Sequence, residues 1–159
     1  MKYRIISVGK IREKFYMNGI QEYLKRLGPY TKIEFVDGLE EKLGQNLSEK
    51  DIERLLRKEG EKILNLITPD EILVVLDIDG KQISSQDLAG QIERWNASGA
   101  PRVNLIVGAS YGVSPEVKMR ANERISFSKM TFPHQMAVMI LTEQIYRGFK
   151  IIRGEPYNK

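Results

Sequence analysis

The chain has 159 residues, of which 42% are hydrophobic and 29% charged, and it contains no cysteine and one histidine, with a formal net charge of +4. This composition indicates a folded globular protein, and it excludes disulfides, cysteine-ligated metals, a thiol nucleophile and any metal site or mechanism that needs two imidazoles. Residues 115–159 hold eight basic and four acidic side chains, whereas residues 1–114 hold 17 of each, so the excess positive charge suits either a polyanion-binding segment or an ordinary solvated basic face.

The first half of the chain alternates short apolar runs with amphipathic segments. The runs Tyr3–Val8 and Lys32–Val36 predict strands, and the first is too short for a signal peptide core. Apolar residues at helical spacing predict a helix over Glu13–Leu27, and a second one that begins at a Ser48-x-x-Asp51 capping box and ends before Thr68. Residues 37–47 are polar and predict a loop. No run reaches the roughly 18 apolar residues of a membrane span, so we expect a cytoplasmic protein without a membrane partner.

The second half continues the same alternation. The sequence predicts three further strands, a turn after the first of them, and three further helices, in the following places: strand Ile72–Leu76, turn 77–81, helix Ser84–Asn96, strand Val103–Val107, a short helix from Ser114-Pro115, strand 125–128, and helix His134–Arg153. Alternating strands and helices predict one α/β domain over residues 1–159 with a mainly parallel sheet. The last helix has an unusually wide apolar arc, which favours burial on two sides and a symmetric dimer.

Two glycine-containing turns follow predicted strands. Asp77-Ile78-Asp79-Gly80 begins like a calcium loop, but its twelfth position is Leu88 rather than an acid, so we expect no metal there. The turn Gly108–Gly112 follows a buried strand at the sheet edge where open α/β sheets bind ligands. It matches neither the phosphate loop nor the dinucleotide fingerprint, and taken alone it suits a simple tight turn better than a binding site.

The segment Ser126–His134 is more informative, because hydroxyl side chains alternate in it with Phe127, Met130 and Phe132. Such a segment can line an apolar slot while its backbone hydrogen-bonds the edge of an adenine. Further along, Arg147, Lys150 and Arg153 recur at three-residue spacing before Tyr157. They either offset the helix dipole or form a phosphate clamp with a stacking tyrosine.

These features together make the sequence similar to one known family over essentially its whole length. The similarity rests on the following segments: Val8-Gly9-Lys10, Lys25-Arg26-Leu27, Glu59-Gly60-Glu61, Leu76–Lys81, Ser126–His134, Glu143-Gln144-Ile145-Tyr146-Arg147 and Gly154-Glu155-Pro156-Tyr157. The chain resembles the RlmH family of SPOUT-class methyltransferases. The most specific segments are Ser126–His134 and Glu143–Arg147.

The resemblance implies a SPOUT-type α/β fold with a C-terminal trefoil knot, a homodimer, and S-adenosylmethionine bound in the knot within about residues 72–159. It implies methylation of N3 of a pseudouridine in 23S ribosomal RNA on the assembled large subunit or ribosome, without a metal. The cofactor contacts that it implies are Leu76, Gly108, Phe127, Ser128, Lys129, Met130, Thr131 and Phe132. The pocket chemistry read from the residues suits this cofactor, and Asp77 or Asp79 could balance its sulfonium charge.

The methyl transfer implied by the resemblance is a direct displacement, in which the protein mainly supplies alignment and electrostatics. We expect His134 and Arg153 to act in catalysis, as a base or as a cation that favours the imide anion. The residues expected to contact RNA are Arg147, Lys150, Arg153, Tyr157 and Lys159.

Two alternatives stay open from sequence alone. Val138 and Asn158 stand where the resemblance leads us to expect an arginine and a histidine, and Ala109 and Gly148 where we expect a glycine and an alanine. The first two departures favour a catalytically weakened or inactive RNA-binding or ribosome-binding paralogue that keeps the fold. The second alternative is a small-molecule α/β enzyme unrelated to RNA, whose function would not depend on salt.

Overall fold

Five strands form one sheet in which every neighbouring pair runs parallel, in the order β2-β1-β4-β3-β5. The structure, a computed structural model, describes residues 2–42 and 44–159. The strands are β1 (Lys2–Ser7), β2 (Lys32–Val36), β3 (Ile72–Gln82), β4 (Arg102–Val107) and β5 (Glu123–Ser126). The helices are α1 (Lys14–Leu27), α2 (Glu49–Asn65), α3 (Ser85–Ala97), α4 (Pro115–Arg120) and α5 (His134–Ile152). The predicted α/β class and its parallel sheet are confirmed.

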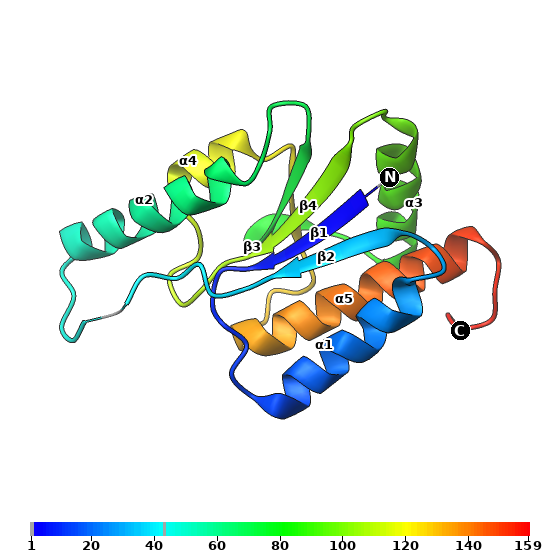
Figure 1. The fold of residues 1–159 in the computed structure, drawn as a ribbon, viewed down its shortest axis with the longest axis horizontal. Helices are drawn as coiled ribbons and strands as arrows, with labels where there is room; N and C mark the ends of the chain where they lie inside the picture. The colour runs from blue at the N-terminus through cyan, green and yellow to red at the C-terminus, as the bar shows by residue number, and fades with distance from the viewer. Residues whose placement is uncertain (1, 43) are drawn as a thin grey trace.

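The helices lie in two layers, one on each face of the sheet (Figure 1). Helices α1, α3 and α5 cover one face, where Ile20, Ile92 and Leu141 are buried in a core with β1, β3 and β4. Helices α2 and α4 cover the other face, where Ile63 and Val117 pack on the opposite sides of the same strands. Because both faces are covered, the central strands are continuously apolar rather than alternating.

Helix boundaries agree with the predictions to within two or three residues because the cap chemistry is present. The side chains of Ser48 and Ser84 each accept a hydrogen bond from the backbone N–H three residues on, and the backbone N–H of each serine donates to the aspartate at that position, which completes a capping box. Ser114 caps α4 with the first of these bonds alone, by accepting the N–H of Val117, and Pro115 stands at the first helical position.

The predicted turn at residues 77–81 is wrong. Strand β3 runs through it to Gln82 with a bulge, since Leu76 and Lys81 both pair with Ile125 and the residues between them are pushed out of register. The bulge requires a glycine at position 80, because glycine has no Cβ atom. A Cβ there would lie only 2.8 Å from the backbone carbonyl carbon of Arg124.

The strand predicted at residues 125–128 lies two residues earlier in the structure, at β5. The hydroxyl of Ser126 donates to the carbonyl of Ser128 at 2.9 Å. This local side-chain bond turns the chain away from the sheet directly after Ser126, where strand propensity alone predicts continuation.

Helix α5 is the central helix of its layer and lies between α1 and α3 (Figure 1). Glycines let its neighbours approach closely: a Cβ on Gly19 of α1 would meet the sulfur of Met139, and one on Gly148 of α5 would lie 2.5 Å from Ile92 of α3. Several apolar side chains of α5 remain only partly buried in one chain, namely Met136, Met139, Ile140, Ile151 and Ile152. The symmetric dimer and the trefoil knot stay predictions. Within the described residues, no helix is long and apolar enough to cross a membrane.

Candidate functional site

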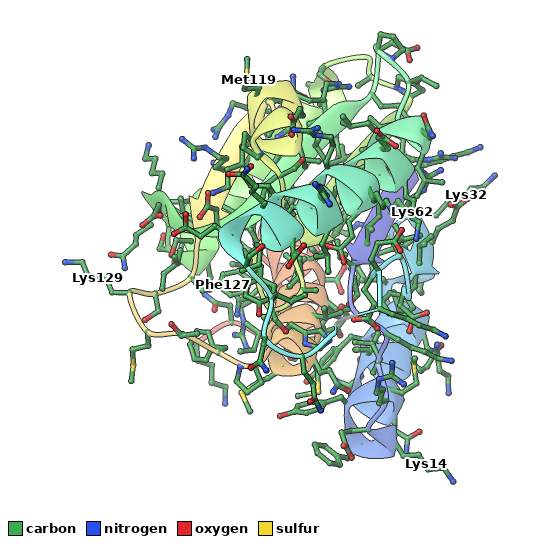
Figure 2. The ribbon with its side chains drawn as sticks, turned by 90° about the vertical axis from the view of Figure 1, so that its left-hand side faces the viewer. Lys14, Lys32, Lys62, Met119, Phe127 and Lys129 are labelled. Carbon is green, nitrogen blue, oxygen red and sulfur yellow. The ribbon has the colours of Figure 1, made fainter. Side chains whose placement is uncertain are left out.

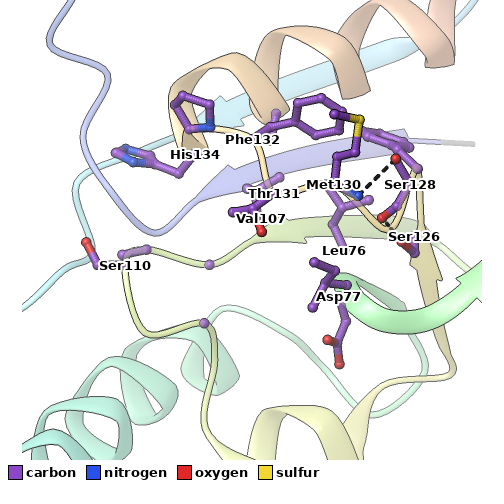
Figure 3. Close-up of a pocket in the computed structure, with 17 residues that line it drawn as sticks. Leu76, Asp77, Val107, Ser110, Ser126, Ser128, Met130, Thr131, Phe132 and His134 are labelled. Atoms are coloured by element: carbon purple, nitrogen blue, oxygen red, sulfur yellow. Dashed lines mark hydrogen bonds between the residues drawn. The ribbon is translucent and has the colours of Figure 1, made fainter.

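A cavity of about 510 Å³ lies where β4 and β5 end and where the bulge of β3 begins, beside the N-terminus of α5 (Figure 3). Three chain segments build it: the start of the β3 bulge, the turn after β4, and the segment from β5 to α5. Its lining residues are Leu76, Asp77, Ile78, Val107, Gly108, Ala109, Ser110, Gly112, Ser126, Phe127, Ser128, Met130, Thr131, Phe132, Pro133, His134 and Ala137. The cavity therefore occupies the carboxyl-end position at which ligands bind to open parallel sheets.

The turn after β4 has a shape that requires glycine. A Cβ on Gly108 would lie 2.7 Å from the carbonyl carbon and oxygen of Gly112, and backbone atoms cannot move aside as a side chain can. Gly112 has a φ of 78° and donates its N–H to the carbonyl of Ala109 at 2.9 Å. The methyl group at Ala109 is accommodated against the α2–α4 core, so this departure from the expected glycine does not disrupt the turn.

The segment between β5 and α5 supplies the apolar wall. Phe127 and Phe132 pack partly against the α1–α3–α5 core, and the hydroxyl of Ser128 accepts the backbone N–H of Met130 at 3.0 Å. The backbone N–H groups of Thr131 and Phe132 have no acceptor within residues 2–42 and 44–159. Free backbone donors beside apolar walls match the slot that the sequence predicts here.

Asp77 forms the acidic part of the wall, but its charge is already offset. Its Oδ2 atom lies 3.3 Å from a guanidinium nitrogen of Arg124 and 3.6 Å from the ammonium of Lys118. Its Oδ1 accepts the N–H of Asp79 at 3.1 Å. Asp77 thus stabilises the β3 bulge and ties it to β5 and α4, and it has little net charge left for a ligand. In the part of the chain that the structure describes, no group of three His, Asp or Glu residues could hold a metal ion.

His134 begins α5 and lies at the cavity, against the backbone of Gly9. Its Nε2 atom is buried and has no hydrogen-bond partner among the described residues. The next residue, Gln135, accepts the backbone N–H groups of Arg12 and Glu13 at 2.9 and 3.0 Å. The start of α5 is therefore joined to the loop that follows β1.

Seven of the eight residues predicted to contact a cofactor line this cavity. Lys129 does not; it lies at the outer tip of its loop, with its side chain directed away from the protein (Figure 2). The lining residues that were not predicted as contacts or singled out for another role in the cavity are Ser110, Gly112, Pro133, Ala137, Ile78, Val107, Ala109 and Ser126. The first two belong to the Gly108–Gly112 turn already singled out in the sequence, whereas Ala137 gave no chemical signal.

The C-terminal residues predicted to bind RNA form a network at the other end of α5. Glu143 Oε1 accepts hydrogen bonds from Arg147 Nε at 3.0 Å, Arg147 Nη2 at 2.5 Å and the Tyr157 hydroxyl at 3.0 Å. Burial, with the Tyr23 and Glu143 hydrogen bonds, holds the pKa of Tyr157 well above its ordinary value. Arg147 also donates to Asn158 at 3.0 Å, so the side chain at position 158 keeps an acceptor role there.

Lys150 and Arg153 gather around Tyr30. Lys150 lies 2.8 Å from Glu155, whose hydrogen bond, together with that of Tyr30, raises the pKa of the lysine. The same lysine, followed by Tyr30, lowers the pKa of Glu155. The Arg153 guanidinium lies 4.6 Å from the centre of the Tyr30 ring. Arg147 and Lys150 are thus paired with acids, while Arg153 and Lys159 stay exposed.

The structure does not bring the two predicted catalytic residues together within one chain. His134 begins α5, and Arg153 follows its last residue. A helix rises 1.5 Å per residue, so the two ends lie about 28 Å apart. The cavity and the basic C-terminus are therefore separate features of a single chain.

Val138 supplies packing rather than surface charge. Its side chain is fully buried in the core between the sheet and α1, α3 and α5. Its place in the core therefore does not support the idea that a surface contact with RNA has been lost there.

Comparisons with known proteins agree with this geometry. A family model described as "Predicted SPOUT methyltransferase" matches residues 1–158. Three proteins named "Ribosomal RNA large subunit methyltransferase H" align with the whole chain over their own whole length. They come from Syntrophomonas wolfei at 61% identity, Clostridium beijerinckii at 48% and Bacillus pumilus at 46%.

Proposed function

Because this chain belongs to the SPOUT methyltransferase family, we propose that it transfers a methyl group from S-adenosylmethionine to N3 of a pseudouridine in the 23S RNA of the large ribosomal subunit. The observation that carries the proposal is the cavity at the β3 bulge and the ends of β4 and β5, in a chain that aligns end to end with large-subunit RNA methyltransferases. A ribosomal substrate places the protein in the cytoplasm.

The cavity fits S-adenosylmethionine in size and in chemistry. Its volume of about 510 Å³ lies in the usual range for small-molecule sites. The free N–H groups of Thr131 and Phe132 suit an adenine edge, and Leu76, Phe127 and Met130 offer apolar contact to the ring and the thioether arm. When bound, this cofactor supplies a methyl carbon that a sulfonium makes electrophilic. The offset charge of Asp77 makes it a support for the β3 bulge rather than the counter-ion to that sulfonium.

The protein's own groups then have two tasks at the reacting base. N3 of the pseudouridine must lose its proton, and the resulting negative charge must be stabilised while the nitrogen faces the methyl carbon. His134 lies at the cavity and is placed to receive the proton. Arg153 is a permanent cation that stabilises the imide anion.

The position of Arg153 requires a second chain. In one chain it lies about 28 Å from His134 along α5, so both reach one base only if a partner's C-terminus approaches the cavity. A homodimer with the two α5 helices antiparallel does this, and it also covers the partly buried apolar side of α5. The site is then composite, with the donor pocket from one subunit and the basic C-terminus from the other.

RNA contact follows from the same arrangement. Arg153 and Lys159 are free to meet phosphate, and Arg147 and Lys150 would exchange their acidic partners for it. Tyr157, held by Glu143, offers a ring edge and face at the same end of α5.

The direct test uses large subunits and whole ribosomes that lack the modification. Incubation with labelled S-adenosylmethionine should place the label on one pseudouridine of 23S RNA, located by nuclease mapping and mass spectrometry. A protein that binds the cofactor in a calorimetric titration but labels neither substrate, beside an active relative as control, is the inactive paralogue instead. A protein that does not bind the cofactor contradicts the assignment of the cavity.

A further inference from the structure

An exposed aromatic ring lies among cations at the start of α1. Phe15 is 64% exposed, one of the largest exposures of any apolar side chain in the described residues. Its ring contacts Tyr16 with centroids 4.4 Å apart, and Tyr16 packs in turn against the core. Phe15 is therefore held outward on a fixed support, at a site where burial gives no reason for a large apolar residue.

Three cations, Lys10, Arg12 and Lys14, precede this ring in the sequence. Lys10 and Lys14 are exposed, and their ammonium groups have no hydrogen bond or ion pair within the described part of the chain, although the backbone N–H of Lys10 donates to Glu40 at 3.2 Å. Arg12 is 70% exposed and lies 3.4 Å from Glu40. The acids nearby are Glu13, Asp37 and Glu40, of which Glu40 pairs with Arg12 and Asp37 accepts a backbone N–H. The ammonium groups of Lys10 and Lys14 are therefore the cations left without an acid partner among the described residues. An accessible ring in a segment with unpaired cations is an arrangement that proteins use to stack an unpaired base and hold its phosphates.

The segment 10–16 is fixed in place next to the donor cavity. Ile11 donates its N–H to Asp37 at 2.9 Å, and the N–H groups of Arg12 and Glu13 both bind Gln135, the neighbour of His134. Figure 1 shows the N-terminal ends of α1 and α5 side by side, and Figure 2 places Lys14 at the free end of α1. Such anchoring holds the ring in one position before any ligand arrives, which lowers the entropy cost of binding.

We propose that Phe15 is a stacking platform for an unpaired nucleotide of the ribosomal RNA near the methylated base, with Lys10 and Lys14 on the flanking phosphates. This rests on the proposed function, because the RNA that reaches the cavity mouth also passes the start of α1. The surface selects for single-stranded RNA by its ring and for no particular sequence, since every base offers a face for stacking.

The test compares Phe15→Ala, Phe15→Leu and Phe15→Trp in steady-state methylation of large subunits. Loss of the ring in the first two should raise KM for the subunit by about tenfold and leave kcat within about twofold. Phe15→Trp should retain the normal KM. Met119→Ala is the matched control, because Met119 is 86% exposed and lies at the opposite end of the molecule (Figure 2).

The cations are tested separately by salt. Lys10→Gln with Lys14→Gln should reduce the slope of log affinity against log salt by roughly 1.5, as expected for two lost phosphate contacts. Light scattering and calorimetry should show the same oligomer and the same cofactor affinity in every variant.

Three outcomes overturn the proposal. An unchanged KM in Phe15→Ala shows that no base stacks there. A loss of oligomer mass in Phe15→Ala that Phe15→Leu restores shows that the ring packs against a second copy of the chain. A full KM effect in Phe15→Ala with none in Phe15→Leu shows apolar contact rather than stacking. Failure of the unmodified protein to methylate any subunit counts instead against the proposed function.

Discussion

The ring of His134 lies against the backbone of Gly9, at a distance where a Cβ atom on Gly9 would be 2.5 Å from Nε2. This contact joins the loop after β1 to the first residue of α5 and sets the position of the imidazole at the cavity. A glycine in the first strand–helix connection thereby controls a side chain that lies 125 positions later in the chain.

Substitution Gly9→Ala should displace the imidazole. Overpacking of this kind costs about 1–3 kcal/mol in the free energy of unfolding, and it should lower kcat while cofactor affinity changes little. In a His134→Ala background the added methyl group has room, so the cost of Gly9→Ala should largely disappear. Urea unfolding of the two single variants and the double variant measures this coupling. Strictly additive effects would show that the two residues do not contact each other.

The turn after β4 should be intolerant of any side chain at Gly108. The added Cβ of Gly108→Ala would meet backbone atoms of Gly112 at 2.7 Å, so the turn itself must shift. We expect S-adenosylmethionine affinity to fall by at least tenfold in calorimetric titration. Gly90→Ala in α3 is the control, because its nearest neighbour would be the Arg94 guanidinium at 3.5 Å. That change should stabilise the helix by about 0.5–1 kcal/mol and leave cofactor binding intact. Equal affinities for both variants would contradict the assigned role of the turn.

Glu59 predicts a specific pH dependence. The side chain is buried and accepts the N–H of Glu41 at 2.9 Å, and burial raises its pKa above the ordinary 4.5, with further raising by Glu40 and Glu41. The folded state therefore favours the protonated carboxyl, and this stability is present below pH 4.5 and is lost as pH rises through the folded pKa. Glu59→Gln keeps an acceptor without the charge. It should raise Tm at pH 8 by roughly 2–4 °C, the effect of about 1 kcal/mol in a domain of this size.

The same substitution should give no gain at pH 4, where the carboxyl is already neutral. Glu61→Gln, an exposed change two residues away, is the control and should have little effect at either pH. Calorimetric melting of both variants at the two pH values provides the comparison. A gain from Glu59→Gln that is equal at pH 4 and pH 8 would rule out ionisation as its cause.

The parts of the fold that local chemistry determines could be predicted. Serine caps at Ser48, Ser84 and Ser114 fixed three helix starts, and continuous apolar runs identified the central strands. The β3 bulge could not be predicted, because it depends on Gly80 meeting the backbone of Arg124, 44 positions later. The end of β5 was missed for a related reason, since a serine hydroxyl there competes with the sheet.

In the candidate site, too, local sequence features could be predicted and contacts between distant residues could not. Hydroxyl and aromatic residues in Ser126–His134 indicated a slot, whereas the individual cofactor contacts, including Leu76 and Gly108, were predicted through the family resemblance. The contact of Gly9 with His134 could not be predicted, because it joins residues far apart in the chain. The ion pairs of Arg147 and Lys150 could not be predicted either, because a sequence shows which residues are charged but not which of them pair. The count of basic residues near the C-terminus therefore overstated the charge that is free to bind RNA.

The composite site predicts that two defective chains can complement each other. Gly108→Ala removes the donor pocket, and Arg153→Ala removes the cation at the far end of α5, so each homodimer should be inactive. In a heterodimer one site carries both defects and the other carries neither. Random mixing makes half of the dimers mixed, and one of the two sites in each is intact, so about a quarter of normal activity should return.

This recovery must need subunit exchange, so it should appear after joint refolding and be absent when the two purified dimers are simply combined and assayed at once. A mixture of Gly108→Ala with His134→Ala is the control, because His134 and Gly108 line the same cavity in one chain. If His134 acts in its own subunit's cavity, each site of the mixed dimers carries one defect and this mixture should stay inactive. Recovery in this control with none in the Arg153 mixture would reverse the assignment, placing the arginine in its own subunit's site and the histidine across the interface.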